Sequence, residues 1–426
     1  MHVPKAATNS GRMPVSLPRQ ILLFTAAGNG NWGDNMQPLS WYSHICQRWR
    51  CGVQVQLTSS TAFNRSAEYD YPFPAKKHIV DEKCASGHSL CKWPGDVLWI
   101  GGGGLLAWPH LPLAHNKHNW QRRVPQSVVL AAVGVCCNAG ANAAAAPLLR
   151  RAVYASGRHE PDVDLLKALG APAPFLMPDP ILCDAINYPA PPINYSLPRT
   201  AQHAVQQLPT ARRPKRVERR TCWIFSYAET VQHLQHVRDR LLQPQDTLID
   251  MEVENRRYHG VFGSREVETH HTGTELFSKL VHECDVVVSN RYHGVVLALR
   301  AILPVVGITY DPRRSRKVEN LLAMFGESRC VCDSNVYSAD FGRCLLERLH
   351  ACPRLLNVTS RLARLHEVEQ TFDHALLVAM DKQQEHKALR PQPRLPHQHV
   401  PHTHARGLPH PSHGVAGSAS SRAATR

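Results

Sequence analysis

The sequence predicts an α/β protein made of two domains, each built around a mostly parallel sheet. Three observations predict this architecture. The chain has 426 residues, which is long enough for two hydrophobic cores. Short, continuous apolar runs, typical of strands buried on both faces, alternate with amphipathic segments that are typical of helices. A Pro- and Arg-rich segment, residues 186–220, separates two such regions and is expected to be a linker.

The first predicted domain spans residues 20–185, and residues 1–19 before it are expected to form a flexible arm. The run "QILLFT" predicts its first strand, which a Gly- and Asn-rich turn and an amphipathic helix follow. The runs "DVLWIGG", "SVVLAAVGV" and "AVYASG" predict further strands. The segment after "AVYASG" predicts a helix that begins around residues 160–162 and ends at Gly170.

The second predicted domain spans residues 221–358, and its clearest strands are "TCWIFSY", "DVVVS" and "PVVGITY". An amphipathic helix is expected over residues 359–384. Residues 385–426 are rich in Pro, His, Ser and Ala, so they cannot bury a core and are expected to be disordered. Two such domains favour a ligand cleft between them, at the carboxyl ends of their strands.

The net charge of +15 raises the question of a nucleic-acid partner. Residues 1–20, 199–220 and 385–426 together carry +14 of this charge. The rest of the chain is close to neutral, so the basic residues belong to an arm, a linker and a tail rather than to a groove. No nucleic-acid partner is expected, and nothing in the sequence predicts an oligomeric state.

The thirteen cysteines form no Cys-x-x-Cys pair and match no zinc-site spacing. They are expected to be buried or idle thiols, and neither a metal nor another cofactor is expected. No apolar run is long enough to span a bilayer, and "ILLFTAA" is too short for a signal peptide. A cytoplasmic location is the default expectation; in a secretory lumen the sequons at Asn64, Asn194 and Asn357 would become relevant.

Charged residues lie at both ends of the apolar segment 289–314. The strand "DVVVS" ends at Ser289, so Arg291 and His293 are expected in the first turn of the next helix, beside unpaired backbone N–H groups. The strand "PVVGITY" is expected to run parallel to "DVVVS", so that Arg313 emerges at the same edge. These side chains predict a phosphate or carboxylate site, the alternative being an exposed turn with solvated charges.

Four segments resemble the polysaccharide pyruvyl transferase family, and they occur in the family's order: "GNGNWGDNM", "LWIGGGGLL", "YASGRHEPDVDLLKALGAPAPFLMPDPIL" and "SNRYHGVVLALRAILPVVGITYDPR". The matching regions cover about residues 20–185 and 221–330. The resemblance implies a GT-B-like fold, in which two Rossmann-like domains face a cleft. It also implies an enzyme that transfers pyruvate from phosphoenolpyruvate onto two hydroxyls of a sugar as a cyclic ketal, with phosphate released.

The resemblance also implies a donor site, because phosphoenolpyruvate carries a phosphate and a carboxylate and needs several cationic groups. The residues that match the family pattern there are Arg158, Arg291, Tyr292, His293 and Arg313. Arg313 stands where the family usually has lysine, which keeps the charge but replaces a point charge by a planar guanidinium. We expect the first domain to contribute the acceptor side and the second domain the phosphoenolpyruvate side.

Catalytic roles follow from the chemistry of this donor. His293 is the expected acid, and Arg291 is expected to stabilise the charge that develops as phosphate leaves. Asp34 is the candidate base, although it could equally be the N-cap of the first helix. Asp179 is interpreted as a turn-forming residue before Pro180. The expected acceptor or cleft-lining residues, which could alternatively serve only tight packing, are Asn31, Gly33, Asp34, Gly102, Gly103 and Gly104.

Two other functions fit parts of this pattern. A GT-B glycosyltransferase with a nucleotide-sugar donor would share the anion site, and Asp311 or Glu319 could then bind ribose hydroxyls. A non-catalytic saccharide-binding relative would keep the fold without the donor site. The presence of Arg158, Arg291 and His293 argues against this last alternative.

Overall fold

The structure is a computed structural model that describes residues 20–25, 32–49, 54–59, 97–102, 127–134, 146, 148–183, 219–225, 241–251, 267–269, 273–309, 316–333 and 339–388. Within these residues the chain forms two six-stranded sheets. All pairs of neighbouring strands are parallel. The predicted α/β class with two parallel sheets is therefore confirmed.

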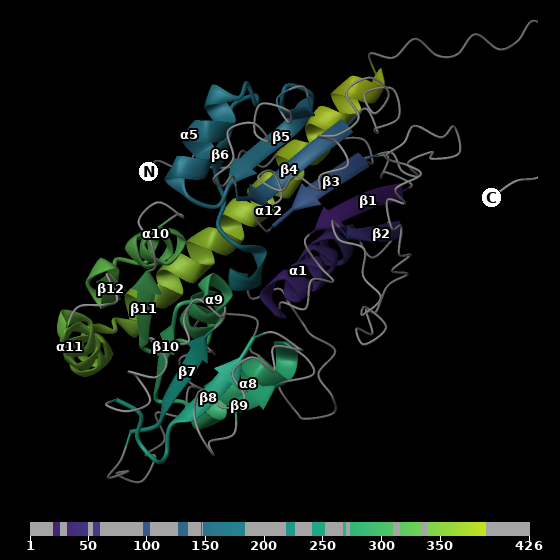
Figure 1. Cartoon of the computed structure of the whole chain (residues 1–426). Helices are drawn as coiled ribbons and strands as arrows, with labels where there is room; N and C mark the ends of the chain where they lie inside the picture. Colours follow the sequence, from purple (N-terminus) through teal and green to yellow (C-terminus); the bar gives the residue numbers. More distant parts are fainter. Residues whose placement is uncertain are drawn as a thin grey trace, which may run out of the picture. The chain divides into compact units, whose positions relative to one another are not determined.

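The first sheet is formed by the N-terminal part of the chain. Its strands are β1 (Gln20–Thr25), β2 (Gln54–Ser59), β3 (Val97–Gly101), β4 (Ser127–Val133), β5 (Ala152–Gly157) and β6 (Phe175–Leu176). Their order in the sheet is β2-β1-β3-β4-β5-β6 (Figure 1). Every residue of β3 and β5 is buried, as continuous apolar runs predict for strands covered on both faces.

The second sheet follows the same principle. Its strands are β7 (Thr221–Phe225), β8 (Thr247–Asp250), β9 (Val267–Thr269), β10 (Val286–Ser289), β11 (Val305–Thr309) and β12 (Val331–Asp333). The order is β12-β11-β10-β7-β8-β9, with the fully buried β10 and β7 at the centre (Figure 1). The sequence does not predict the edge strands β2, β9 and β12, because they are short or alternate apolar with polar residues.

The helices connect and cover the strands. They are α1 (Trp32–Trp49), α5 (Glu160–Ala168), α8 (Gly273–Glu283), α9 (Tyr292–Arg300), α10 (Lys317–Met324), α11 (Ala339–Leu355) and α12 (Val358–Ala388), with the 3-10 helices η4 (Pro180–Leu182) and η7 (Ser328–Cys330). Helix α9 connects β10 to β11, which pair in parallel as the sequence predicts. The carboxyl ends of β10 and β11 therefore lie at one edge of the sheet.

The long helix α12 packs against the first sheet's helix α1, although it follows the second sheet in the chain (Figure 1). The Phe372 ring lies 5.3 Å from the Trp41 ring and 5.4 Å from the His44 ring, measured between centroids. At the start of α12 the buried Arg361 pairs with Glu327, with Nε 2.8 Å from Oε1, and donates to the Leu303 carbonyl. Helix α12 thus contacts both halves of the protein.

Two predicted segment boundaries need correction. Helix α12 continues to Ala388, so residues 385–388 of the segment expected to be disordered are helical. Residues 219–220 of the expected linker are fixed on the second sheet, where the Arg220 backbone N–H donates to Asp285 Oδ2 at 2.9 Å. The remainder of the expected linker and tail, and the arm 1–19, lie outside the described residues.

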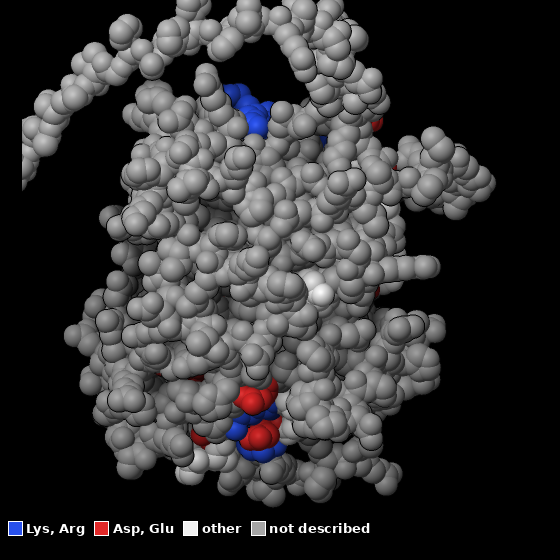
Figure 2. Space-filling view, turned by 90° about the vertical axis from the view of Figure 1, so that its right-hand side faces the viewer, with Lys and Arg blue, Asp and Glu red and all other residues white. Residues whose placement is uncertain are grey.

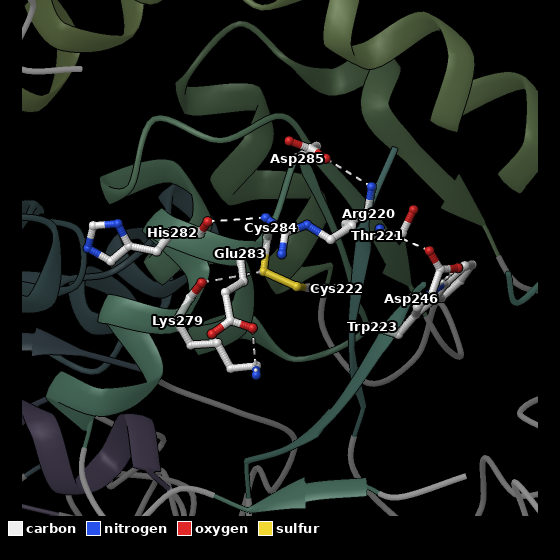
Figure 3. Close-up of a disulfide and its surroundings, with 10 residues drawn as sticks. All are labelled: Arg220, Thr221, Cys222, Trp223, Asp246, Lys279, His282, Glu283, Cys284 and Asp285. Carbon is white, nitrogen blue, oxygen red and sulfur yellow. Dashed lines mark hydrogen bonds and ion pairs between the residues drawn. A yellow bond between two sulfur atoms is a disulfide. The ribbon is translucent and has the colours of Figure 1, made fainter. Parts of the chain in front are cut away.

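Three disulfides join elements of the second half. They are Cys222–Cys284, Cys330–Cys352 and Cys332–Cys344. The first connects β7 to the residue after α8, as Figure 3 shows, with a Cα–Cα distance of 5.6 Å that is usual for a disulfide. The expectation of idle thiols is wrong for these six cysteines. The sequence cannot show their pairing, because partners are neighbours in space and not in the chain.

The described surface carries charges of both signs. On the face shown in Figure 2, acidic and basic side chains lie next to each other near the lower end, and the described residues of this face form no continuous basic field. A pair of this kind is the half-buried Lys279 with the exposed Glu283 in α8, whose charged atoms are 3.0 Å apart. Among the described helices, none has the combination of length and apolar composition that a membrane span requires.

Candidate active site

The candidate site lies where residues that follow the strands of both sheets meet. From the first sheet come α1, which follows β1, the residues directly after β5, and the turn before η4. From the second sheet come the start of α9, which follows β10, and the start of α10. Carboxyl ends of parallel strands are the usual position of ligand sites in α/β proteins.

His293 of the second sheet is surrounded by side chains of the first. It lies in the first turn of α9, and only 6% of its surface is exposed. Its Nε2 atom is 3.3 Å from Asp179 Oδ2, 3.2 Å from Gln37 Nε2 and 4.0 Å from Asp34 Oδ1. A carboxylate at this distance orients the imidazole ring and selects its tautomer.

Asp179 is fully buried and joins several of these groups. Its Oδ1 accepts the backbone N–H of Ile181 at 3.0 Å and so caps η4. Its Oδ2 accepts from Gln37 Nε2 at 2.8 Å and lies 4.0 Å from Arg158 Nη1. The turn-forming interpretation is therefore correct for one oxygen and incomplete, because the other oxygen faces His293.

The protonation of Asp179 is decided by two opposing effects. Burial acts to raise the pKa of this carboxyl group. The hydrogen bond and charge of His293, the charge of Arg158 and the N–H of Ile181 outweigh burial, and the pKa of Asp179 lies below its ordinary value. Asp179 is therefore an ionised carboxylate inside the site.

Two glycines allow this close packing. A Cβ atom added to Gly33 would overlap the His293 ring. Gly102 has a φ of +71°, and a Cβ there would overlap the Gln37 amide. Both glycines are predicted from the sequence as cleft-lining residues. In the structure Gly33 lies directly against His293, and Gly102 lies directly against Gln37.

Arg158 and Tyr292 form the next layer of the site. The Arg158 side chain is 2% exposed, and its Cζ lies 4.9 Å from the centre of the Tyr292 ring. Arg158 Nε and the Tyr292 hydroxyl are buried and have no hydrogen-bond partner among the described residues. Burial, followed by the charge of Asp179, raises the pKa of Tyr292, so this hydroxyl keeps its proton.

His159 and Asp162 form a pair that the sequence analysis missed. The pair is buried, with His159 Nδ1 2.7 Å from Asp162 Oδ2, and the imidazole contacts the edge of the Tyr292 ring at 5.6 Å between centroids. Burial lowers the pKa of His159 despite the neighbouring Asp162. The position of His159, directly after a buried strand and Arg158, is the signal that could have identified it.

Lys317 is a further cation that the sequence analysis missed. It is half-buried, begins α10 and interacts with the charges of Arg158, Asp162, Asp34 and Arg291. Burial, with the charge of Arg158 next, lowers the pKa of Lys317 to about 8. Its amine is thus partly neutral at slightly alkaline pH.

Two expectations about helix starts are wrong. Arg291 is the N-cap of α9 and not a residue of its first turn, and its backbone N–H donates to Ser289 Oγ at 3.0 Å. Asp34 lies inside the first turn of α1, so it is not the N-cap of that helix. A helix start is decided by backbone hydrogen bonds, and several adjacent polar residues can satisfy the same sequence rule.

Other predicted site residues are not among these contacts. Asn31, Gly103, Gly104 and Arg313 lie outside the described residues, as does the alternative ribose-binding residue Asp311. The other alternative residue, Glu319, pairs with Arg316 at 3.5 Å. No group of three His, Cys, Asp or Glu side chains with metal-site geometry occurs in the described part of the chain.

The arrangement combines an imidazole, an ionised carboxylate and three cations. Arg158, Arg291 and Lys317 repel one another unless an anion lies between them, and an anionic ligand would stabilise all three. His293 can give or take a proton next to that anion. The site therefore has the composition needed for proton transfer on an anionic substrate.

Comparisons with known proteins agree with this architecture. UDP-N-acetylglucosamine 2-epimerase from Rickettsia bellii aligns with a TM-score of 0.53 at 12% identity, over 86% of this chain and 98% of its own. MnaA of S. aureus, in a structure with UDP, aligns with a TM-score of 0.50 at 10% identity, over 85% of this chain and 98% of its own. These similarities show a GT-B-like fold and nothing finer. None of the curated proteins matches the sequence significantly.

The sequence pattern described as polysaccharide pyruvyl transferase matches residues 39–312, which is more than half of the chain. The matched range includes the later part of α1, the residues after β5, the turn at Asp179 and the start of α9, whereas Gly33, Asp34 and Gln37 at the beginning of α1 precede it. The chain therefore belongs to the polysaccharide pyruvyl transferase family.

Proposed function

We propose that the protein transfers a pyruvyl group from phosphoenolpyruvate onto two hydroxyls of a sugar in a polysaccharide or glycan, with release of phosphate. The observation that carries the proposal is the contact of His293 with the ionised Asp179, directly beside Arg158. A proton donor next to an anion site is what this reaction requires, because the donor is a strongly anionic enol ester that reacts only after protonation.

Donor binding is assigned to the cations on both sides of the cleft. Arg158 and Arg291 neutralise the phosphate, and Arg313, which lies outside the described residues, is the third proposed cation. Tyr292 holds the Arg158 guanidinium over its ring, which fixes the direction of the donor hydrogen bonds. No metal is needed to balance the charge in this scheme.

The chemical steps balance without a further reactant. His293 protonates the methylene carbon of phosphoenolpyruvate, which makes the neighbouring carbon electrophilic. One sugar hydroxyl oxygen forms a bond to this carbon, phosphate leaves with the electrons of the carbon–oxygen bond, and a second hydroxyl oxygen takes its place. Of the two hydroxyl protons, one replaces the proton that His293 gave to the methyl group and the other leaves with phosphate.

The acceptor side is assigned to the start of α1. Asp34 is the proposed base for a sugar hydroxyl, and its position 4.0 Å from His293 Nε2 allows the proton to return to the imidazole. Gly103 and Gly104, with Asn31, would let the sugar approach the backbone, whereas Gly33 and Gly102 are packed against His293 and Gln37.

The alternative function is glycosyl transfer from a nucleotide sugar. The solved structures with similar folds include a UDP-N-acetylglucosamine 2-epimerase and MnaA with UDP. That donor would need an acidic residue for its ribose hydroxyls, and the described candidate Glu319 is engaged with Arg316. We therefore favour phosphoenolpyruvate.

Incubation with phosphoenolpyruvate and a panel of β-galactosides and N-acetylmannosamine-containing glycans tests the proposal. We expect acceptor-dependent phosphate release together with a mass gain of one pyruvyl group on the sugar. Absence of phosphate release with every acceptor, combined with thermal stabilisation by a nucleotide sugar, would favour glycosyl transfer instead.

A further inference from the structure

Three groups of the site have no task in the scheme above. They are the Lys317 amine, the His159 imidazole and the Tyr292 hydroxyl. His159 contacts the edge of the Tyr292 ring, and Lys317 acts electrostatically on both His159 and Arg158. The three groups therefore gather on the Arg158 side of the site, with the start of α10 beside them.

Two of these groups are buried and unpaired. His159 is 3% exposed and Tyr292 is 8% exposed, and neither His159 Nε2 nor the Tyr292 hydroxyl has a hydrogen-bond partner among the described residues. Leaving a buried polar group unpaired is unfavourable, so such groups in a cleft commonly face a ligand. His159 Nδ1 donates to Asp162, so Nε2 of the neutral ring is an acceptor and the Tyr292 hydroxyl is the unpaired donor.

The chemistry of the donor separates its two anionic groups. Phosphate leaves during the reaction and needs the guanidinium groups and the acid His293. The carboxylate stays on the product and needs donors that do not change during the reaction. A carboxylate carries one charge, which one ammonium balances, and it can accept a further hydrogen bond from a neutral donor such as a hydroxyl.

We propose that Lys317 and Tyr292, whose ring packs against His159, form a separate carboxylate position, which binds the carboxylate of phosphoenolpyruvate while Arg158 and Arg291 bind its phosphate. This inference rests on the proposed function. Lys317 provides the charge, and the backbone N–H groups at the start of α10 add positive potential. The position selects donors that carry both a phosphate and a carboxylate.

The test compares ligands that carry both groups or only one. Binding of phosphoenolpyruvate, inorganic phosphate and ethyl phosphate is measured by calorimetry for the wild type and Lys317→Met. We expect Lys317→Met to weaken the binding of phosphoenolpyruvate about tenfold to a hundredfold. The affinities for inorganic phosphate and ethyl phosphate are expected to change less than about threefold. Lys279→Met, which removes a half-buried lysine of α8 that pairs with Glu283 outside the site, is the matched control and is expected to bind like the wild type.

A pH series adds a second, independent readout. Because the pKa of Lys317 is lowered to about 8, its charge disappears as the pH rises above 8, and phosphoenolpyruvate affinity is expected to fall by up to about tenfold per pH unit. Lys317→Arg stays charged and is expected to remove this decline. The charged and titratable groups facing Lys317 are Arg158, His159, Asp162, Asp34 and Arg291.

The outcomes separate this inference from the proposed function. If the wild type binds no phosphoenolpyruvate, the proposed function fails. If the wild type binds it and Lys317→Met binds it equally well and with the same pH dependence, the carboxylate position is wrong and the function stands. Unchanged phosphate binding by Lys317→Met shows that the variant is folded.

A different observation, the three disulfides, carries a second inference. Two thiols become a disulfide only when an oxidant accepts two electrons and two protons, and the reducing cytosol opposes this. The cysteines of the three pairs are 62, 22 and 12 residues apart in the chain. The first pair connects β7 to the residue after α8 (Figure 3), and the other two connect η7 and β12 to α11. Three separate pairs indicate that the second half is built for an oxidising compartment.

The sequon at Asn357 is in a suitable place for modification there. Asn357 lies between α11 and α12 and Thr359 in the first turn of α12, and both are exposed. Asn357 Oδ1 accepts the Ser360 backbone N–H at 2.9 Å, which leaves the amide nitrogen as the atom for attachment. We infer that the chain matures in a secretory compartment, where thiol oxidases supply the disulfides and Asn357 receives an N-glycan. The amide nitrogen bonds to the sugar's anomeric carbon, the lipid diphosphate leaves and a proton is released.

The full chain, directed into the secretory route of a eukaryotic cell, provides the test. Peptide mass mapping of the unreduced protein is expected to show the three disulfide-linked pairs. Glycosidase treatment is expected to shift the gel mobility of the wild type, and this shift should be larger than that of Asn357→Gln by the size of one glycan. Dithiothreitol is expected to lower the thermal midpoint by about 5–10 °C or more. Alkylatable thiols at these six positions in the folded protein, or an unmodified Asn357 peptide, would overturn the respective part of the inference.

Discussion

Replacing His293 with glutamine is expected to lower kcat by about 10²–10⁴-fold, while the affinity for phosphoenolpyruvate changes only a few fold. Glutamine can keep a hydrogen bond to Asp179, so the buried carboxylate retains a partner, but it cannot donate a proton to the methylene carbon. Steady-state rates of phosphate release and calorimetric binding of phosphoenolpyruvate measure the two effects separately.

His44 provides a matched control for this variant. It is a second buried histidine, 3% exposed, stacked on Phe372 between α1 and α12 and outside the site. Burial lowers the pKa of His44 to about 4, so it is neutral in the folded protein. His44→Gln is expected to reduce stability and to leave kcat unchanged. A His293→Gln enzyme with wild-type kcat would mean that another group is the acid.

Replacing Asp179 with asparagine is expected to lower kcat by about 10²-fold or more with little change in phosphoenolpyruvate affinity. Asparagine keeps the size of the side chain and can still accept the Ile181 N–H. Its amide can also face the Gln37 oxygen, which has no partner among the described residues. The variant therefore removes the charge next to His293 and little else, so Asp179 is tested as a positioning residue.

The control for Asp179→Asn is Asp246→Asn. Asp246 also binds several groups, the Thr221 N–H and the Trp223 indole N–H at 3.0 Å each, but it lies at the opposite, amino ends of β7 and β8 (Figure 3). Asp246→Asn is expected to lower the unfolding midpoint without lowering kcat. If both variants lose stability and keep kcat, Asp179 is only a structural residue.

The sequence is sufficient for the parts of the fold that depend on local pattern. Fully buried strands such as β5 and β10 are readable as continuous apolar runs. The parallel pairing of β10 with β11 follows from the crossover helix between them and brings their carboxyl ends to one edge. The placement of Arg291 and His293 at the start of α9 follows from the same reasoning.

The contacts of the site that the sequence does not predict depend on how residues of the two sheets meet. Gln37 lies on α1 and Asp179 before η4, and both contact His293 of the other sheet over separations of more than a hundred residues. No periodicity in the sequence encodes such a contact. Lys317 begins a short helix whose start follows no capping signal. The disulfide pairs likewise depend on tertiary neighbours.

The central claim is that the enzyme breaks the carbon–oxygen bond of phosphoenolpyruvate and keeps its carbon skeleton on the sugar. The most direct measurement uses phosphoenolpyruvate with a heavy oxygen isotope in the bridge between carbon and phosphorus. Mass spectrometry of the phosphate released in the presence of the acceptor then reports which bond was broken. Pyruvyl transfer predicts that the released phosphate carries the heavy isotope. Unlabelled phosphate would show cleavage between phosphorus and the bridging oxygen, as in phosphoryl transfer, and would contradict the proposed function.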